Sequence, residues 1–136
     1  MNSRKLLFIL FSIIFLLFAS SCEKKIEKIE EKTRKEVEGL WKRIDVSNVS
    51  SDTYDEWRFT NGKFDVVRCH IATNQRDSIV TGDYVISANL TKKNITITNC
   101  SDSHINDKWR IHILKDDYFS FYRRFGGLEY LEFTRQ

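Results

Sequence analysis

The feature that most constrains the fold is an alternation of apolar and polar residues, which extends from about residue 39 to the end of the chain. Trp109, Ile111 and Ile113, for example, are separated by single polar residues. Because side chains two residues apart lie on the same face of a β-strand, this period predicts strands with one apolar face. The predicted strands are roughly Leu40–Ser47, Tyr54–Thr60, Lys63–Ile71, Asp77–Ile86, Lys92–Thr98, Lys108–Lys115, Tyr118–Arg123 and Leu128–Arg135.

The connections between these segments predict how the strands are arranged. Several connections are too short for a crossover helix, so neighbouring strands are expected to be antiparallel. Asn61-Gly62 is the strongest hairpin signal, and Thr81-Gly82-Asp83 is expected to form a bulge or turn. Because no second helical layer is predicted, the sheet must cover its apolar face by closing on itself or by folding into a sandwich. Eight strands match the smallest barrel that is filled by side chains or holds one small ligand. We therefore predict an all-β fold, a small eight-stranded antiparallel up-and-down barrel.

The first 22 residues are expected to lie outside this fold. Leu6 to Phe18 are apolar except for Ser12, and Arg4 and Lys5 precede them. A basic flank followed by a short apolar core and small residues is typical of a secretory signal peptide. The core is too short to cross a bilayer comfortably, which needs about 20 apolar residues.

The end of this signal, Ala19-Ser20-Ser21-Cys22, resembles the lipobox of bacterial lipoproteins. In that family the cysteine is acylated and becomes the mature N-terminus. The resemblance implies a protein that is attached to a lipid bilayer through Cys22, in the bacterial cell envelope and at the outer membrane. The alternative is an ordinary cleaved signal in which Cys22 has no special role.

Residues 23–38 are almost entirely Glu, Lys and Arg. Within them, Ile26, Ile29, Thr33 and Val37 recur at spacings of three and four, which places them on one narrow helical stripe. An isolated helix of this length is marginal in water. We predict a charged, partly helical and solvated spacer between the membrane and a barrel domain at 39–136. A partner helix for a coiled coil is the alternative.

Charge and motifs argue against several classes of function. Without residues 1–22, the chain keeps 20 of its 22 basic side chains and all 19 acidic ones, so its charge gives no reason to expect a nucleic acid as partner. His70, His104 and His112 lack metal-ligand spacing, and no nucleophile elbow, phosphate loop or zinc-protease motif occurs. The sequence predicts no catalytic residues, no metal and no cofactor, and therefore a protein that is not an enzyme.

Two cysteines remain if Cys22 carries lipid. Cys69 and Cys100 form an even pair in a compartment where disulfides persist, so a Cys69–Cys100 disulfide is expected. In a simple meander the two cysteines would lie near one rim, two strands apart, and the bond needs flanking loops that bend inward. Two separate buried thiols are the alternative.

Gly39-Leu40-Trp41, at the start of the first predicted strand, resembles the Gly-x-Trp signature of lipocalins. The segments Trp57 to Phe64, Gly82-Asp83-Tyr84, Asn94 to Ile97 and Tyr130 to Phe133 extend the resemblance to the lipocalin-like domains of bacterial lipoproteins. The resemblance implies that Trp41 packs across the closed end of the barrel against a basic residue of the last strand. Arg135 is at the matching position. It also implies a small apolar or amphipathic ligand, in a cup that is shallow because the strands are short.

Arg68, Arg123 and Arg135 share the parity of neighbouring apolar residues, so each is expected to point toward the interior or its mouth. A buried, unpaired cation is costly, and each arginine therefore needs a carboxylate, a carbonyl, an aromatic face or a ligand anion. The alternative to ligand binding stacks Arg135 on Trp41 and lets the other two arginines extend to the rim. The residues predicted to bind a ligand are Arg123, Arg68, Tyr84, Trp57, Phe121 and Tyr130.

Three functions remain open on the sequence alone. The first is an anchored lipocalin-like barrel that binds a small ligand. The second is an anchored barrel that blocks a protein through its rim or outer face, as an inhibitor or immunity factor would. The third is a structural envelope lipoprotein. An interior filled with side chains would favour the second function over the first.

Overall fold

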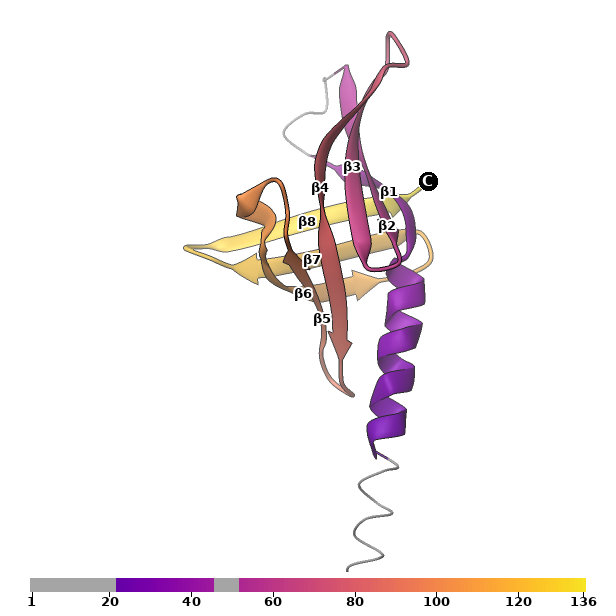
Figure 1. The fold of residues 1–136 in the computed structure, drawn as a ribbon, viewed down its shortest axis with the longest axis vertical. Coiled ribbons are helices and arrows are strands. Elements are labelled where there is room, and N and C mark those ends of the chain that lie inside the picture. The colour runs from indigo at the N-terminus through magenta and orange to yellow at the C-terminus, as the bar shows by residue number, and fades with distance from the viewer. Residues whose placement is uncertain (1–21, 46–51) are drawn as a thin grey trace, which may run out of the picture.

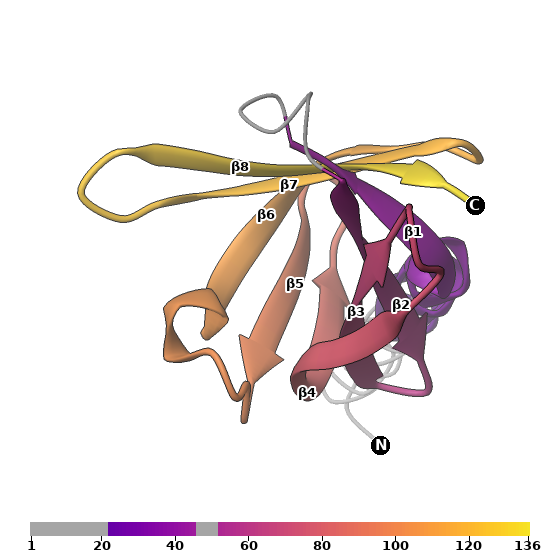
Figure 2. The same ribbon diagram turned by 90° about the horizontal axis from the view of Figure 1, so that it is seen from above.

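A closed, eight-stranded antiparallel barrel forms the body of the protein, as predicted (Figures 1 and 2). The computed structural model describes residues 22–45 and 52–136. The predicted signal residues 1–21 and the predicted end of the first strand at Ser47 lie outside these ranges. The strands are β1 Gly39–Ile44, β2 Thr53–Thr60, β3 Lys63–His70, β4 Arg76–Ala88, β5 Lys93–Thr98, β6 Asp107–Leu114, β7 Tyr118–Arg124 and β8 Leu128–Arg135, and a 3-10 turn, η2 Ser103–Ile105, lies between β5 and β6.

The long strand β4 joins two halves of the barrel. Its first part pairs with β3, from Cys69 opposite Arg76 to Lys63 opposite Asp83, and its second part pairs with β5. The bulge or turn expected at Thr81-Gly82-Asp83 is wrong, because β4 runs through these residues without interruption and its pairing with β3 is irregular at Ile79 instead. Gly82 instead leaves room for an aromatic ring, since a Cβ atom there would lie 2.6 Å from Cε1 of Phe64. The register irregularity in this pairing lies opposite Val66 and Val67.

The interior of the barrel is filled by aromatic side chains. Neighbouring rings lie in contact, with centroids from 5.1 Å apart for Phe119 and Phe121 to 6.5 Å apart for Trp57 and Phe121. Burial of each such ring contributes about 1.5–3 kcal/mol, so this cluster is the main source of stability. The largest fully buried side chains of the barrel are Trp41, Trp57, Trp109, Phe59, Phe119, Phe121, Phe133, Ile95, Ile97 and Val66.

A helix at residues 22–37 packs against the barrel with its last two turns (Figure 1). The stripe predicted from the sequence is the face that the helix buries: Thr33 and Val37 are fully buried. Two contacts fix the helix on the second half of the sheet, where the backbone N–H of Ala88 donates to Oε1 of Glu30 at 2.9 Å and Lys93 pairs with Glu36 at 3.6 Å. The prediction of a solvated spacer therefore fits only the first part of the helix, because the end of the helix packs into the barrel core.

Candidate functional site

The structure does not bring the six predicted ligand-binding residues together. Trp57, Tyr84 and Phe121 are buried in the core. Arg123 is buried near one end of the barrel, whereas Arg68 lies on the rim and Tyr130 on the outer surface. Three separate places therefore have to be considered as sites: the interior, the rim and the outer face.

Gly39, Trp41 and Arg135 meet where the helix joins the barrel. The guanidinium of Arg135 lies 4.2 Å from the centroid of the Trp41 ring and donates to the carbonyl oxygens of Glu36 at 2.8 Å and Asp116 at 2.7 Å. Gly39 has a φ of 133°, and a Cβ atom there would lie 2.6 Å from Nη1 of Arg135. The Trp41 indole donates to the carbonyl of Val37 at 2.8 Å, which ties this arrangement to the helix. These contacts give Arg135 a structural role.

The positive charge of Arg123 is balanced by carboxylates of the protein itself. Its Nε donates to Glu129 at 2.7 Å, its Nη1 lies 3.5 Å from Asp107, and its guanidinium lies 4.4 Å from the centroid of the Trp109 ring. The Arg123 side chain is 8% exposed, while both carboxylates reach solvent. Arg123 therefore closes the interior with an internal ion-pair cluster and needs no ligand anion.

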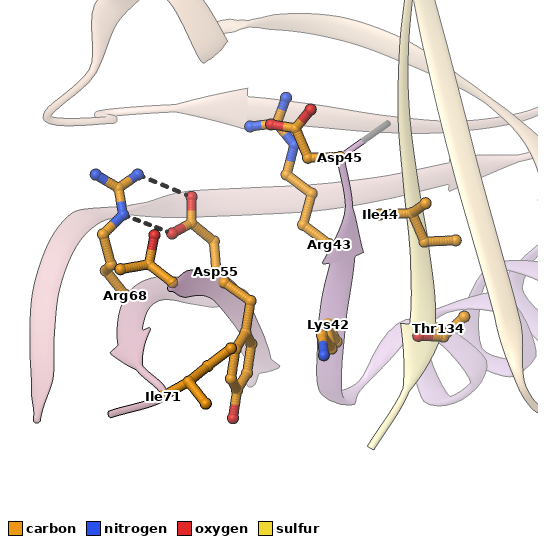
Figure 3. Close-up of a pocket in the computed structure, with 10 residues that line it drawn as sticks. Lys42, Arg43, Ile44, Asp45, Asp55, Arg68, Ile71 and Thr134 are labelled. Carbon is orange, nitrogen blue, oxygen red and sulfur yellow. Dashed lines mark hydrogen bonds and ion pairs between the residues drawn. The ribbon is translucent and has the colours of Figure 1, made fainter. Parts of the chain in front are cut away.

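Arg68 lies beside an open pocket at the rim, which is drawn in Figure 3. It donates from Nε and Nη2 to the two carboxylate oxygens of Asp55 at 2.9 and 3.1 Å, and this bonding raises the pKa of Arg68. Figure 3 shows Arg43 and Asp45, at the end of β1, on the other side of the pocket. The pocket has a volume of about 490 Å³ and also includes the half-exposed Ile71.

The predicted Cys69–Cys100 disulfide is wrong, because both cysteines are free and buried. The reason is the offset of the two halves along β4. Cys69 lies opposite Arg76, whereas the backbone N–H of Ser101, next to Cys100, donates to the carbonyl of Thr81 at 3.0 Å. The stretch from Arg76 to Thr81 spans roughly 16 Å of extended strand, well beyond the reach of a disulfide. Burial raises the pKa of both thiols, which keeps them protonated and unreactive.

The outer surface gathers residues that the sequence reading did not single out. Lys92, Lys108, Arg110 and Arg124, with Asn94 and Tyr122, line a groove of about 510 Å³ on β5, β6 and β7, which we call the basic groove. The lining also includes Arg123. Next to it, the rings of Tyr122 and Tyr130 lie 5.3 Å apart, and His112 lies 5.9 Å from Tyr130. The sequence does contain a signal for this surface, because the polar residues that alternate with the apolar ones in β6 are Lys108, Arg110 and His112.

The part of the chain that the structure describes contains no group of three or more His, Cys, Asp or Glu side chains that could hold a metal ion. Within that same part, no helix has the length and apolar character needed to cross a membrane. Comparisons of this chain with protein-family models, with curated proteins and with solved structures gave no match.

Proposed function

We propose that the mature protein is a lipid-anchored, lipocalin-like barrel of the bacterial cell envelope that binds a protein partner through its outer surface. The observation that carries the proposal is the filled interior. A site for a small molecule usually needs about 300–1,000 Å³ of enclosed space. The corresponding space in this barrel holds rings in contact with one another, such as Trp57 stacked on Phe64 with centroids 5.4 Å apart.

Opening such a space would be expensive. Removal of one aromatic side chain from a packed core costs about 3–5 kcal/mol, which is comparable to the whole stability of a small domain. Binding in the interior would require several rings to leave together, because Trp57 and Phe121 each contact other rings of the cluster. The surface of the barrel is therefore the better place for a partner.

The β7–β8 hairpin supports a role for the outer surface. Figure 2 shows this hairpin projecting beyond the rest of the barrel. Phe125 is 75% exposed at its tip, Leu128 is 57% exposed, and Tyr130 is 43% exposed. Exposed aromatic and apolar residues that gather on one element are typical of protein interaction sites.

The position of Cys22 supports the anchor. Cys22 is exposed at the beginning of the helix, and the end of the helix is fixed to the barrel by the buried Thr33 and Val37. A helix of residues 22–37 is roughly 24 Å long. It leads away from the barrel in Figure 1, so an acyl chain on Cys22 would reach a bilayer without disturbing the domain.

A brominated fatty acid, which quenches tryptophan emission only at contact distance, tests the filled interior. Trp41, Trp57 and Trp109 are all buried, so such a probe would quench their emission inside the barrel but not at the surface. We expect no saturable quenching in the wild-type protein and measurable quenching in Phe121→Ala, whose smaller side chain opens space beside Trp57 and Trp109. Saturable quenching in the wild type would show that the interior accepts ligands and would overturn the proposal.

The anchor is tested separately by labelling with radioactive palmitate in a bacterial host. The wild-type chain should be labelled and should fractionate with membranes, and Cys22→Ser should lose both properties. Cys69→Ser serves as the matched control because Cys69 is buried on β3 and should leave labelling unchanged. Equal membrane association of the wild type and Cys22→Ser would contradict lipid anchoring.

A second candidate function is the binding of a small amphipathic molecule at the rim. The pocket of Figure 3 favours it, because about 490 Å³ is sufficient for a small ligand and the lining includes both Arg68 and the exposed Ile71. Binding there would leave the core Trp residues unquenched. Arg68→Ala should abolish such binding without affecting a partner that uses the β7–β8 hairpin.

A further inference from the structure

We propose that the basic groove and the adjoining tip of the β7–β8 hairpin bind an acidic segment of a partner protein. The inference rests on the proposed function, because it names the chemistry of the protein partner. The first observation is the lining of the groove, which contains Lys92, Lys108, Arg110 and Arg124 and, among the described residues, no carboxylate.

The strand register brings these cations together. Arg110 on β6 lies opposite Asn94 on β5 and opposite Tyr122 on β7. Lys108 is two residues from Arg110 and Arg124 is two residues from Tyr122, so all of them lie on the outward face. Strands β6 and β7 place Lys108, Arg110 and Arg124, whereas Lys92 lies in the connection just before β5.

Four of the five cations that line the basic groove have no ion-pair partner among the described residues, and only Arg123 has one. No side chain of Lys92, Lys108, Arg110 or Arg124 forms an ion pair with any residue in the described ranges 22–45 and 52–136. The remaining segments, 1–21 and 46–51, contain no Asp or Glu. Arg123, the neighbour of Arg124, has two carboxylate partners and so shows the contrast directly. Like charges placed side by side repel, and an external anion relieves this repulsion.

The aromatic residues beside the groove fit a protein segment. Tyr122 lines the groove, the Tyr130 ring lies 5.3 Å from it, and Phe125 and Leu128 are exposed at the nearby hairpin tip. Arginine and tyrosine side chains dominate the energetics of many protein interfaces, and arginine binds carboxylates with two parallel hydrogen bonds. A partner segment that combines Asp or Glu with apolar residues matches both parts of this surface.

The geometry favours a protein over a bilayer or a nucleic acid. Strands β7 and β8 run across the direction of the helix in Figure 1, so an upright helix anchored at Cys22 holds the hairpin tip to the side of the barrel and away from the membrane. Asp107 and Glu129 pair with Arg123 of the groove, reach solvent there, and would repel a long polyanion. A short acidic segment of a protein need not lie near the membrane, and it can bind the groove without reaching Asp107 and Glu129.

The test is a titration of the full chain with a fluorescein-labelled synthetic peptide of alternating Glu and Tyr residues, followed by fluorescence anisotropy. A peptide of alternating Gln and Tyr is the control for charge. The groove variants are Lys108→Glu combined with Arg110→Glu, and the neutral pair Lys108→Gln combined with Arg110→Gln, which tests the same residues without new acidic groups. Arg58→Glu changes one exposed charge on β2, in the other half of the barrel, and is the control for net charge.

We expect the Glu peptide to bind at low salt, the Gln peptide to bind at least about tenfold more weakly, and both groove pairs to lose about tenfold or more in affinity. Arg58→Glu should change the affinity by less than about twofold. The proposal is overturned if the Glu peptide does not bind, or if Arg58→Glu weakens binding as much as the groove pairs do. It is also overturned if vesicles of phosphatidylglycerol bind through the groove and the peptide does not. None of these failures affects the filled interior, which the fatty-acid probe tests independently.

Discussion

Arg68, Arg123 and Arg135 each occupy a strand position in step with neighbouring apolar residues, but their environments differ. Arg135 lies over Trp41 and bonds to backbone carbonyls, Arg123 is enclosed by Glu129 and Asp107, and Arg68 forms an exposed pair with Asp55. Parity alone could place each arginine on the inner side of a strand. It could not identify the partner, because that depends on the strand register. Asp55 lies opposite Arg68 in the β2–β3 hairpin and Glu129 lies opposite Arg123 in the β7–β8 hairpin, whereas the carbonyl partners of Arg135 come from distant parts of the chain.

Arg123→Ala is expected to lower the free energy of unfolding by about 1–3 kcal/mol, because it removes a charge-assisted hydrogen bond and leaves Glu129 without its partner. The side chains of Glu129 and Asp107 are 48% and 37% exposed, and their hydration limits the loss. Urea denaturation measures the effect. Arg124→Ala, at an exposed position, should stay within about 0.5 kcal/mol of the wild type. Equal stability of both variants would mean that the internal ion pairs contribute nothing.

Gly39→Ala is expected to destabilise the protein by about 1–3 kcal/mol, because the residue combines a φ of 133° with a Cβ atom only 2.6 Å from Nη1 of Arg135. The displaced guanidinium should also change the near-UV circular dichroism of Trp41. Gly127→Ala is the matched control, since a Cβ atom at Gly127 meets no other atom within 4 Å. If Gly39→Ala had the stability and the near-UV circular dichroism of the wild type, the close packing of Gly39 against Arg135 would be refuted.

Among the elements, the helix differs most from its expected role. Ile26, Ile29, Thr33 and Val37 lie on one helical face, as their spacing predicts, but the sequence does not show what covers that face. In the structure the barrel covers the last two turns, and Val37 joins the hydrophobic core. This burial stabilises a helix that would be marginal alone, and a coiled-coil partner is not needed for its second half.

Val37→Ala should therefore lower the free energy of unfolding by about 2 kcal/mol, from the lost methyl groups and the cavity they leave. Lys28→Ala, on the exposed part of the same helix, should have almost no effect. Thermal unfolding of the two variants side by side distinguishes an integral helix from a spacer. A spacer would give the same Tm for both.

At the scale of the whole molecule, the long strand β4 determines which residues meet. Because β3 pairs with its first part and β5 with its second, the third and fifth strands are offset along the sheet. This offset separates Cys69 from Cys100 and accounts for the failure of the disulfide prediction, which assumed strands in simple alignment. The same closure encloses the aromatic cluster, which is why we propose a binding surface on the outside of the barrel.

Thiol titration with Ellman's reagent, in a Cys22→Ser background and without reductant, checks the separation of the cysteines. Unfolded protein should show two reactive thiols, Cys69 and Cys100. In the folded state both should react slowly, because burial raises the pKa of each thiol and lowers its thiolate fraction at neutral pH. Absence of reactive thiols after unfolding would indicate a disulfide and would contradict the strand offset.

The sequence by itself determined the class of fold. A period of two and short turns specify strands, antiparallel neighbours and an apolar face that must be enclosed, because these depend only on local geometry and on burial. Tertiary structure alone decided that the interior is filled, that Arg123 finds internal carboxylates, and that Lys108, Arg110 and Arg124 share one surface. These properties depend on strand register and on the offset along β4, and the register contains irregularities at Val66/Val67 and Ile111/Ile113 that the alternation of the sequence does not show.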